Sequence, residues 1–390
     1  MNMIITNGTI VTDQLIPHGA VVVIGDKIIY IGDETEARRI LKAADKDVFQ
    51  VIDAQGGYIA PGLIDVHMHG SDGVDLMDGT EESIRTVARY VVKHGVVGFL
   101  PSTVTASREK TKKVSQLIAD FAGHDDEAEV LGIHLEGPYI NEKMKGAQYG
   151  PEIRRADLKE LEELYNILGK KMRLVTLAPE VPQGLEAVDW LVERGVAVSI
   201  GHSDATYEQA VEGFQRGISH VTHTFNGMRG LHHRDPGVVG AALAAPEVYT
   251  ELIADLVHVH PGAIRVLLAS KGVDKIVLIT DAVQATGLPD GEYVLGDQQI
   301  FVEDGAARLK EGNLAGSTLN LLQAVRNMVE VLGLSLPEAF QMASLNPARS
   351  IGMDYKGWIK EGNDGDFVIM SSDFQVYMTI VGGKVAYSAD

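Results

Sequence analysis

The 390-residue sequence contains no cysteine. Without cysteine the chain cannot form disulfides or thiolate metal sites, so any metal must be held by histidine, aspartate, glutamate or water. The sequence also lacks an apolar run near the roughly 20 residues that span a bilayer. Its N-terminus has no basic segment followed by a long apolar stretch. These absences predict a cytoplasmic protein with neither an export signal nor a membrane anchor.

Positive charge is scarce, since Lys and Arg number 34 against 54 Asp and Glu, which gives a net charge of −20. A protein of this charge repels nucleic acid and anionic membranes, so we expect neither as a partner. No Gly-rich stretch matches a P-loop or a dinucleotide fingerprint, and no Gly-x-Ser-x-Gly elbow surrounds Ser203. The length and the 45% hydrophobic content allow one large domain and a smaller one.

Both ends of the chain consist of short strand-like runs separated by turn residues, for example residues 19–32, 365–370 and 376–387. We therefore predict that residues 1–56 and 358–390 together form one small β-sandwich domain. Residues 57–357 would form the large domain.

Within the large domain, apolar strand-like runs alternate with amphipathic helical stretches, which is typical of a buried parallel sheet with crossover helices. There are eight runs, the number that closes a TIM-like (β/α)8 barrel, and they end near His67, Thr103, Glu136, Ala178, His202, His223, Asp255 and Asp281. Helices are predicted at 183–193, 207–216, 261–270, 319–332 and 337–344. The Gly-rich stretch 286–311 predicts an inserted hairpin.

Polar residues follow most of these runs, at the end of a barrel where the surrounding loops form the active site. His67 and His69 follow the first run, and alternation along a strand puts both imidazoles on the same side. Later runs are followed by Glu136, His202 and His223. A carboxylate and imidazoles suit zinc, ferrous iron or a similar ion and leave a position open for water.

Three further residues are candidates for catalysis or substrate binding. Asp281, after the eighth run, could take a proton from a metal-activated water and return it to a leaving group. His258, just past the seventh run, is a candidate for contact with the substrate or the transition state. Arg234 lies in a basic loop after the sixth run, and such a loop in an acidic chain indicates capture of an anion such as phosphate.

The motifs together resemble the amidohydrolase superfamily and, within it, its branch of deacetylases that act on N-acetylglucosamine 6-phosphate. The resemblance covers most of the chain through segments 61–65, 134–139, 201–205, 222–226, 280–282 and 314–319. Glu136 followed by Gly-Pro points to this branch, because many other members use a modified lysine after the next strand.

The resemblance implies hydrolysis of the acetamide of N-acetylglucosamine 6-phosphate to glucosamine 6-phosphate and acetate, in amino-sugar catabolism. Glu136, His202 and His223 match the shared metal ligands. Asp281 matches the general base and acid and is also a predicted metal ligand, together with His67 and His69. His258 matches the residue that contacts the sugar and polarises the amide. With His67 and His69 present, one or two divalent ions, zinc or iron, could bind, bridged by the glutamate.

The resemblance also implies a substrate-binding set and a homodimer whose neighbouring subunit helps to enclose the phosphate. Arg234 would bind the phosphate, His233 would lie at the neighbouring subunit, and Gln148 stands where some members have histidine. The full substrate-binding set is Ala147, Gln148, Asn226, Gly227, His233, Arg234, His258, Leu314, Ala315 and Gly316.

Three other functions share parts of this pattern. A cyclic-amide hydrolase with two metals commonly has a carboxylated lysine after the fourth strand, and residues 176–180 contain no lysine. A deaminase fits the ligand set but would not require the Arg234 loop. A non-catalytic scaffold with this fold typically loses metal ligands, whereas this chain keeps all of them.

Overall fold

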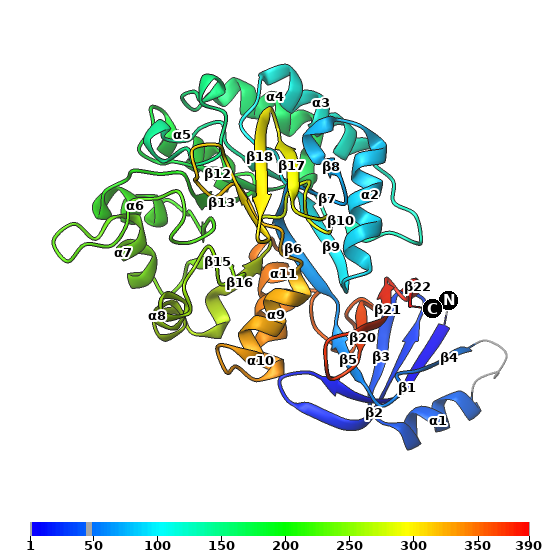
Figure 1. Ribbon diagram of the computed structural model, residues 1–390. Coiled ribbons are helices and arrows are strands. Elements are labelled where there is room, and N and C mark those ends of the chain that lie inside the picture. The colour runs from blue at the N-terminus through cyan, green and yellow to red at the C-terminus, as the bar shows by residue number, and fades with distance from the viewer. Residues whose placement is uncertain (1, 44–48, 390) are drawn as a thin grey trace.

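The structure is a computed structural model that describes residues 2–43 and 49–389. Two sheet systems organise the chain (Figure 1). Segment 44–48 of the predicted N-terminal module lies outside the described residues. No described helix is both long enough and apolar enough to cross a bilayer.

The two ends of the chain meet in one eight-stranded sheet, which we call the small sheet. Its strands are β1 (Asn2–Val11), β2 (Leu15–Ile24), β3 (Lys27–Asp33), β4 (Phe49–Asp53), β5 (Tyr58–Pro61), β20 (Phe367–Met370), β21 (Val376–Val381) and β22 (Lys384–Ser388). The pairing of β5 with β20 joins the N-terminal strands to the C-terminal ones. Residues 58–61, which the sequence assigned to the large domain, therefore belong to this sheet. The predicted sandwich arrangement and domain boundaries stay predictions.

Both faces of the small sheet carry apolar side chains. Met3 and Ile5 of β1 join one apolar cluster, while Ile4 between them joins a second with Ala37. Ala37 belongs to α1 (Glu34–Ala43), which lies along this sheet in Figure 1. Because neighbouring side chains on a strand point to opposite faces, a continuous apolar run fits a strand covered on both sides.

Eight parallel strands alternate with helices through the rest of the chain, as the sequence predicts. They are β6 (Leu63–Met68), β9 (Val96–Pro101), β11 (Ile133–Glu136), β12 (Met172–Leu177), β13 (Ala197–Ile200), β14 (His220–Val221), β15 (Tyr249–Ile253) and β16 (Ile276–Ile279). Each ends within two residues of its predicted end.

These strands lie in two sheets, β10-β9-β6 and β11 to β16, where β10 is Glu129–Val130. Isolated parallel bridges join the two sheets, one between Ser102 and His134 and one between Met68 and Ala282. Regular pairing is thus interrupted at two places, and a fully closed barrel stays a prediction.

Helices alternate with the strands. The helices are α2 (Glu81–Val92), α3 (Arg108–Asp120), α4 (Leu158–Leu168), α5 (Gly184–Val192), α6 (Tyr207–Gln215), α7 (Gly237–Ala244), α8 (Pro261–Lys271), α9 (Leu321–Glu330), α10 (Leu336–Phe340) and α11 (Asn346–Ser350). Four of them, α5, α6, α8 and α9, were predicted within two residues at each end, while the fifth, α10, ends four residues before its predicted end. The sequence reasoning did not identify α2, α3, α4 or α7. In α10 a π-helical turn, Gln341–Leu345, continues the predicted helix.

The inserted segment after β16 forms three antiparallel strands rather than a simple hairpin: β17 (Gly291–Leu295), β18 (Gln298–Glu303) and β19 (Ala306–Arg308). Figure 1 shows β17 and β18 lying across the strand ends. Gln298 at the start of β18 donates a hydrogen bond to the Ala147 carbonyl, and the Gly296 N–H donates to Asp75 at 2.7 Å. These contacts hold the insertion over the carboxyl ends of the parallel strands.

Candidate metal centre

Six predicted ligands converge at the carboxyl ends of the parallel strands, and we call them the ligand cluster. They are His67, His69, Glu136, His202, His223 and Asp281, each at most 8% exposed. Two triads bring ligand atoms within 4.8 Å of one another, His67/His69/Asp281 and Glu136/His202/His223. Imidazole and carboxylate atoms at this spacing fit a divalent metal ion.

Glu136 joins the two triads. Its Oε1 lies 3.1 Å from His202 Nε2 and 3.2 Å from His223 Nε2. Its Oε2 lies 3.3 Å from His69 Nε2, and Oε1 is 3.4 Å from His67 Nε2. One carboxylate therefore faces four imidazoles, which is the geometry required of a bridging ligand.

Each imidazole is oriented through its other ring nitrogen. The Nδ1 atoms of His69, His202 and His223 lie 3.2, 2.9 and 3.1 Å from the carbonyl oxygens of Ser102, Met144 and Asn226, respectively. A carbonyl oxygen only accepts, so these rings carry hydrogen on Nδ1 and present Nε2 to the centre. The orientation of the rings therefore suits metal binding at Nε2.

Three residues of the ligand cluster have strained backbone. His202, His223 and Asp281 follow their strands directly and have φ angles of 48°, 29° and 52°. Positive φ in a residue other than glycine costs about 1–3 kcal/mol, and such residues concentrate at functional sites. The surrounding structure thus holds these side chains in place against a local penalty.

Charge within the cluster shifts the pKa values of its members in opposite directions. Burial raises the pKa of Glu136, but the neighbouring imidazoles, His67 foremost, lower it well below its usual range. Burial likewise opposes the shift at Asp281, where His67 and His69 lower the pKa. Burial lowers the pKa of His69, yet hydrogen bonds to Asp281 and Glu136 raise it to about 9. Both carboxylates are therefore ionised at neutral pH.

A cavity of about 280 Å³ opens above the ligand cluster. Predicted substrate-binding residues among its lining are Ala147, Gln148, Asn226, Gly227, His258, Leu314 and Gly316. The sequence reasoning missed Val104, Leu295 and Asn313, which also line it. Leu295 lies on β17 of the insertion, and the sequence around it does not indicate that the inserted strands reach the cavity.

His258 is aimed by its neighbour Asp255. The Nδ1 atom of His258 lies 2.6 Å from Asp255 Oδ2, and the His258 N–H donates to Oδ1 at 2.8 Å. Burial raises the pKa of Asp255, but the side-chain hydrogen bond from His258, the charge of that ring and the backbone N–H groups of Val257 and His258 together lower it. The contact occupies Nδ1, which leaves Nε2 as the nitrogen free to act in the cavity.

Gln148 lines the cavity, but both ends of its amide are engaged. Its Nε2 donates to Glu136 Oε2 at 2.6 Å, and its Oε1 accepts from the Thr105 N–H at 2.6 Å. These bonds fix the Gln148 amide against a predicted metal ligand, and its contact with the sugar stays a prediction.

Three predicted substrate residues are not brought to the cavity. Ala315 is fully buried beside the lining residues Leu314 and Gly316. His233 and Arg234 are exposed and belong to the loop between β14 and α7, which projects from the molecule in Figure 1. The Arg234 guanidinium lies 2.6 Å from His233 Nε2 and, among the described residues, forms no ion pair with an acid.

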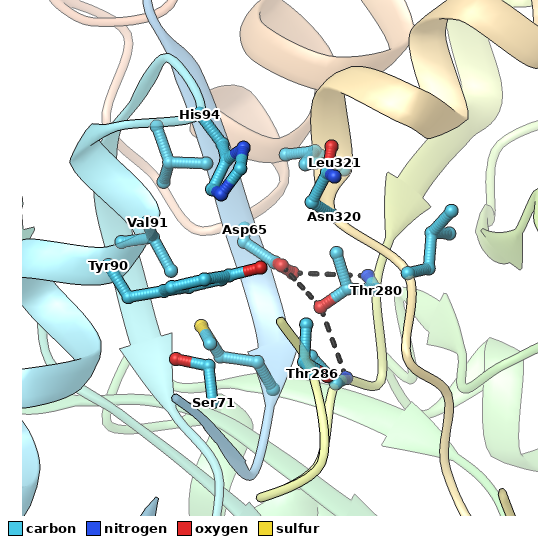
Figure 2. Close-up of a pocket in the computed structure, with 13 residues that line it drawn as sticks. Asp65, Ser71, Tyr90, Val91, His94, Thr280, Thr286, Asn320 and Leu321 are labelled. Carbon is cyan, nitrogen blue, oxygen red and sulfur yellow. Dashed lines mark hydrogen bonds between the residues drawn. The ribbon is translucent and has the colours of Figure 1, made fainter. Parts of the chain in front are cut away.

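Two buried carboxylates beside the ligand cluster escaped the sequence reasoning. Asp65 accepts from the N–H groups of His67 and Thr280 and from the Thr280 hydroxyl at 3.2, 3.4 and 2.6 Å. Figure 2 shows it turned toward Thr280, in a small cavity of about 10 Å³ with Tyr90 and His94. The second is Glu251, on β15. An acidic residue inside an apolar strand is the signal that could have revealed both.

Asp65 faces away from the ligand cluster although it lies two residues before His67. The register of β6 with β9 shifts between Asp65 and Met68, which breaks the strict alternation of side chains. Burial raises the pKa of Asp65 to about 6, while the hydrogen bonds from Thr280 act in the opposite direction. The carboxylate ties the strand that carries His67 to the segment that carries Asp281.

Parallel strands that alternate with helices, with imidazoles and carboxylates at the strand ends, define a class of α/β proteins whose strand ends could hold a metal ion. The sequence matches the amidohydrolase family over residues 58–386, and the chain belongs to this family. Members of this family are generally metal-dependent, which agrees with the donor set described above.

Individual proteins of known activity are similar to this chain. The chain is 42% identical over 335 residues to an N-acetylglucosamine-6-phosphate deacetylase of Lysinibacillus sphaericus, covering 86% of this chain and 87% of the relative. It is 39% identical to an N-acetylgalactosamine-6-phosphate deacetylase of Escherichia coli O157:H7, covering 89% and 92%. A solved mutant of N-acetyl-D-glucosamine-6-phosphate deacetylase from Mycobacterium smegmatis, in complex with N-acetyl-D-glucosamine-6-phosphate, has a TM-score of 0.90 at 30% identity, covering 99% and 100%.

Proposed function

We propose that this protein hydrolyses the acetamide of N-acetylglucosamine 6-phosphate, releasing acetate and glucosamine 6-phosphate. The observation that carries the proposal is the convergence of Glu136, four imidazoles and Asp281 beneath a cavity. The relatives with this activity, similar over most of their length, supply the substrate. The reaction belongs to amino-sugar catabolism.

Glu136, His202 and His223 would hold the catalytic ion, zinc or iron. When bound, the ion supplies a Lewis acid that polarises the acetamide carbonyl and lowers the pKa of a water molecule. His67, His69 and Asp281 would form a second position, so one or two ions could be held per subunit.

Asp281 moves the proton. Its carboxylate is ionised, lies at the cavity, and accepts the proton of the attacking water. The departing nitrogen must be protonated because an amide anion is a poor leaving group, and Asp281 returns the proton to it. His258 is held through Nδ1 by Asp255, and with hydrogen on both ring nitrogens it would donate from Nε2 to the carbonyl oxygen as negative charge develops there.

The sugar occupies the cavity between Ala147, Asn226, Gly227 and the turn 314–316. Arg234 binds the phosphate, because its guanidinium has no acidic partner among the described residues. His233 and Arg234 lie outside the cavity of their own chain, which supports a homodimer in which the neighbouring subunit helps to enclose the phosphate. Size-exclusion chromatography with light scattering tests the dimer directly.

We also propose that the eight parallel strands close into a (β/α)8 barrel. The two isolated bridges between the sheets support closure. The sequence predicts a small domain of residues 1–56 and 358–390. We propose that this domain also includes β5, because the partners of β5 lie in the small sheet.

One assay tests the proposed function. Amine release is measured side by side from N-acetylglucosamine 6-phosphate, N-acetylgalactosamine 6-phosphate and N-acetylglucosamine, with metal analysis of the same sample. We expect the first substrate to give the highest kcat/KM. A higher value for the galactose epimer would reassign the protein to the activity of its 39% identical relative. Folded, metal-loaded protein that releases no amine from any of the three would contradict the proposal.

A further inference from the structure

Glu251 is the most deeply buried acid beside the ligand cluster, with an exposed fraction of 0%. It lies on β15 with apolar Leu252 and Ile253 after it, and no Lys or Arg of the described chain forms an ion pair with it. Burial of a carboxylate without a cationic partner is strongly unfavourable. Its presence therefore requires a specific compensating contact.

That contact reaches both triads through one oxygen. Glu251 Oε2 lies 3.0 Å from His67 Nδ1 and accepts from the His223 N–H at 3.2 Å. Oε1 has no hydrogen-bond partner among the described residues. A single carboxylate oxygen thus links a side chain of one triad to the backbone of the other.

The contact makes His67 different from the other three imidazoles. His69, His202 and His223 donate Nδ1–H to neutral backbone carbonyls, whereas His67 donates to a carboxylate. Hydrogen bonds to an ionised acceptor are stronger than those to a neutral one, and they make the opposite ring nitrogen a better electron donor. His67 is also fully buried, so no solvent competes with Glu251 for Nδ1.

We propose that Glu251 is a positioning residue that sets the affinity of the His67/His69/Asp281 triad for a divalent ion. By fixing hydrogen on Nδ1, it presents His67 Nε2 to that triad, where Nε2 lies 3.6 Å from Asp281 Oδ1. The inference rests on the proposed metal dependence and concerns the second ion rather than the catalytic one.

The test is a zinc titration of metal-stripped Glu251→Gln protein by calorimetry in the presence of a competing chelator. We expect one of two zinc affinities to fall about 10- to 100-fold and the other to stay unchanged, as for loss of a group that orients a metal-bound imidazole. Glu160→Gln is the matched control. Glu160 is also a buried carboxylate, 4% exposed, but it lies on the outer helix α4 and pairs with Arg154. It should change neither affinity.

A double-mutant cycle separates positioning from general loss of structure. In a His67→Ala background, Glu251→Gln should cause no further loss of zinc affinity, since its effect passes through His67. The melting temperature of each metal-free variant reports on folding. If Glu251→Gln does not fold, Glu251→Asp replaces it. Aspartate keeps the carboxylate but is one methylene shorter, so it should lower the affinity of the same zinc site.

The outcomes are separable. Unchanged affinities, an equal fall in both, or a full additional loss in the His67→Ala background would overturn the role of Glu251. A wild-type protein that deacetylates its substrate with one bound zinc would overturn this inference and leave the proposed function intact. Wild-type protein that binds no zinc or other divalent ion would overturn both.

Discussion

The ligand cluster and the 232–235 loop differ in how far the fold has fixed their side chains. In the ligand cluster each imidazole has a partner on its outer nitrogen, and exposure does not exceed 8%. In the loop, His232 and Asp235 close a tight backbone turn, while the side chains of His233 and Arg234 are exposed.

Under the proposed function, this difference separates the residues that carry out the chemistry from part of those that recognise the substrate. Rigid, buried groups suit bond breaking, because they need no reorganisation as charge develops. An exposed loop suits capture of a charged substrate group, and it can be completed by a second subunit. The predictions below test whether the two regions contribute separately, beginning with the largest expected effect.

Removing metal from the ligand cluster should abolish activity. Without the ion, His258 would be left to polarise the acetamide carbonyl and no water would be activated, so chelation should reduce turnover to background, and added zinc or ferrous ion should restore it. Metal analysis and circular dichroism of the same sample establish that the ion was lost and the fold kept. Full turnover by verified metal-free protein would contradict the proposed role of the cluster.

Asp281→Asn should lower kcat about 10²- to 10⁴-fold, the usual range for loss of a general acid-base. The amide is nearly the same size as the carboxylate but cannot accept the proton. Asp189→Asn on the outer helix α5 is the control, since Asp189 pairs only with Arg216 at the surface among the described residues. Metal content must be measured for both variants, and unchanged deacetylation by folded, metal-loaded Asp281→Asn protein would show the mechanism to be wrong.

Arg234→Ala should impair only phosphorylated substrates. Loss of a hydrogen bond to a charged group predicts a fall of about 10- to 100-fold in kcat/KM for N-acetylglucosamine 6-phosphate. Turnover of N-acetylglucosamine should not change. Arg216→Ala provides a comparison at an exposed arginine of α6 that pairs with Asp189 and Glu212. An equal loss on both sugars would mean that the loop does not bind phosphate.

Gln148→Ala should have the smallest effect, about 10-fold, because it removes one hydrogen bond to a charged group. Since Gln148 donates to Glu136, we expect the loss in kcat and metal retention rather than in KM. Steady-state kinetics with metal analysis distinguish a loss in kcat and metal content from a loss in KM. A raised KM at constant kcat and full metal content would instead favour the sugar contact implied by the sequence resemblance.

Local patterns in the sequence predicted much of the fold and the site. Apolar runs gave the strand ends within two residues, because burial on both faces leaves a continuous signal. The same reasoning missed α2, α3, α4 and α7, and it took the inserted strands for one hairpin. It also assigned residues 58–61 to the large domain, although β5 pairs with strands from both chain ends.

Residue type and strand-end position alone selected the six members of the ligand cluster. Their partners could not be selected in this way. Glu251 and His67 are 184 positions apart, and their contact depends on the placement of β15 relative to β6. Asp65 faces away from the cluster only because the register of β6 shifts after it.

The sequence by itself determined which candidate ligands stand at the strand ends, since strand periodicity and the demand of metals for nitrogen and oxygen ligands are local properties. Only the tertiary structure decided that Glu136 faces four imidazoles, that Gln148 turns to Glu136, and that Arg234 stays outside the cavity. Those facts depend on distances between remote segments, which sheet register and loop packing set and which no local pattern encodes.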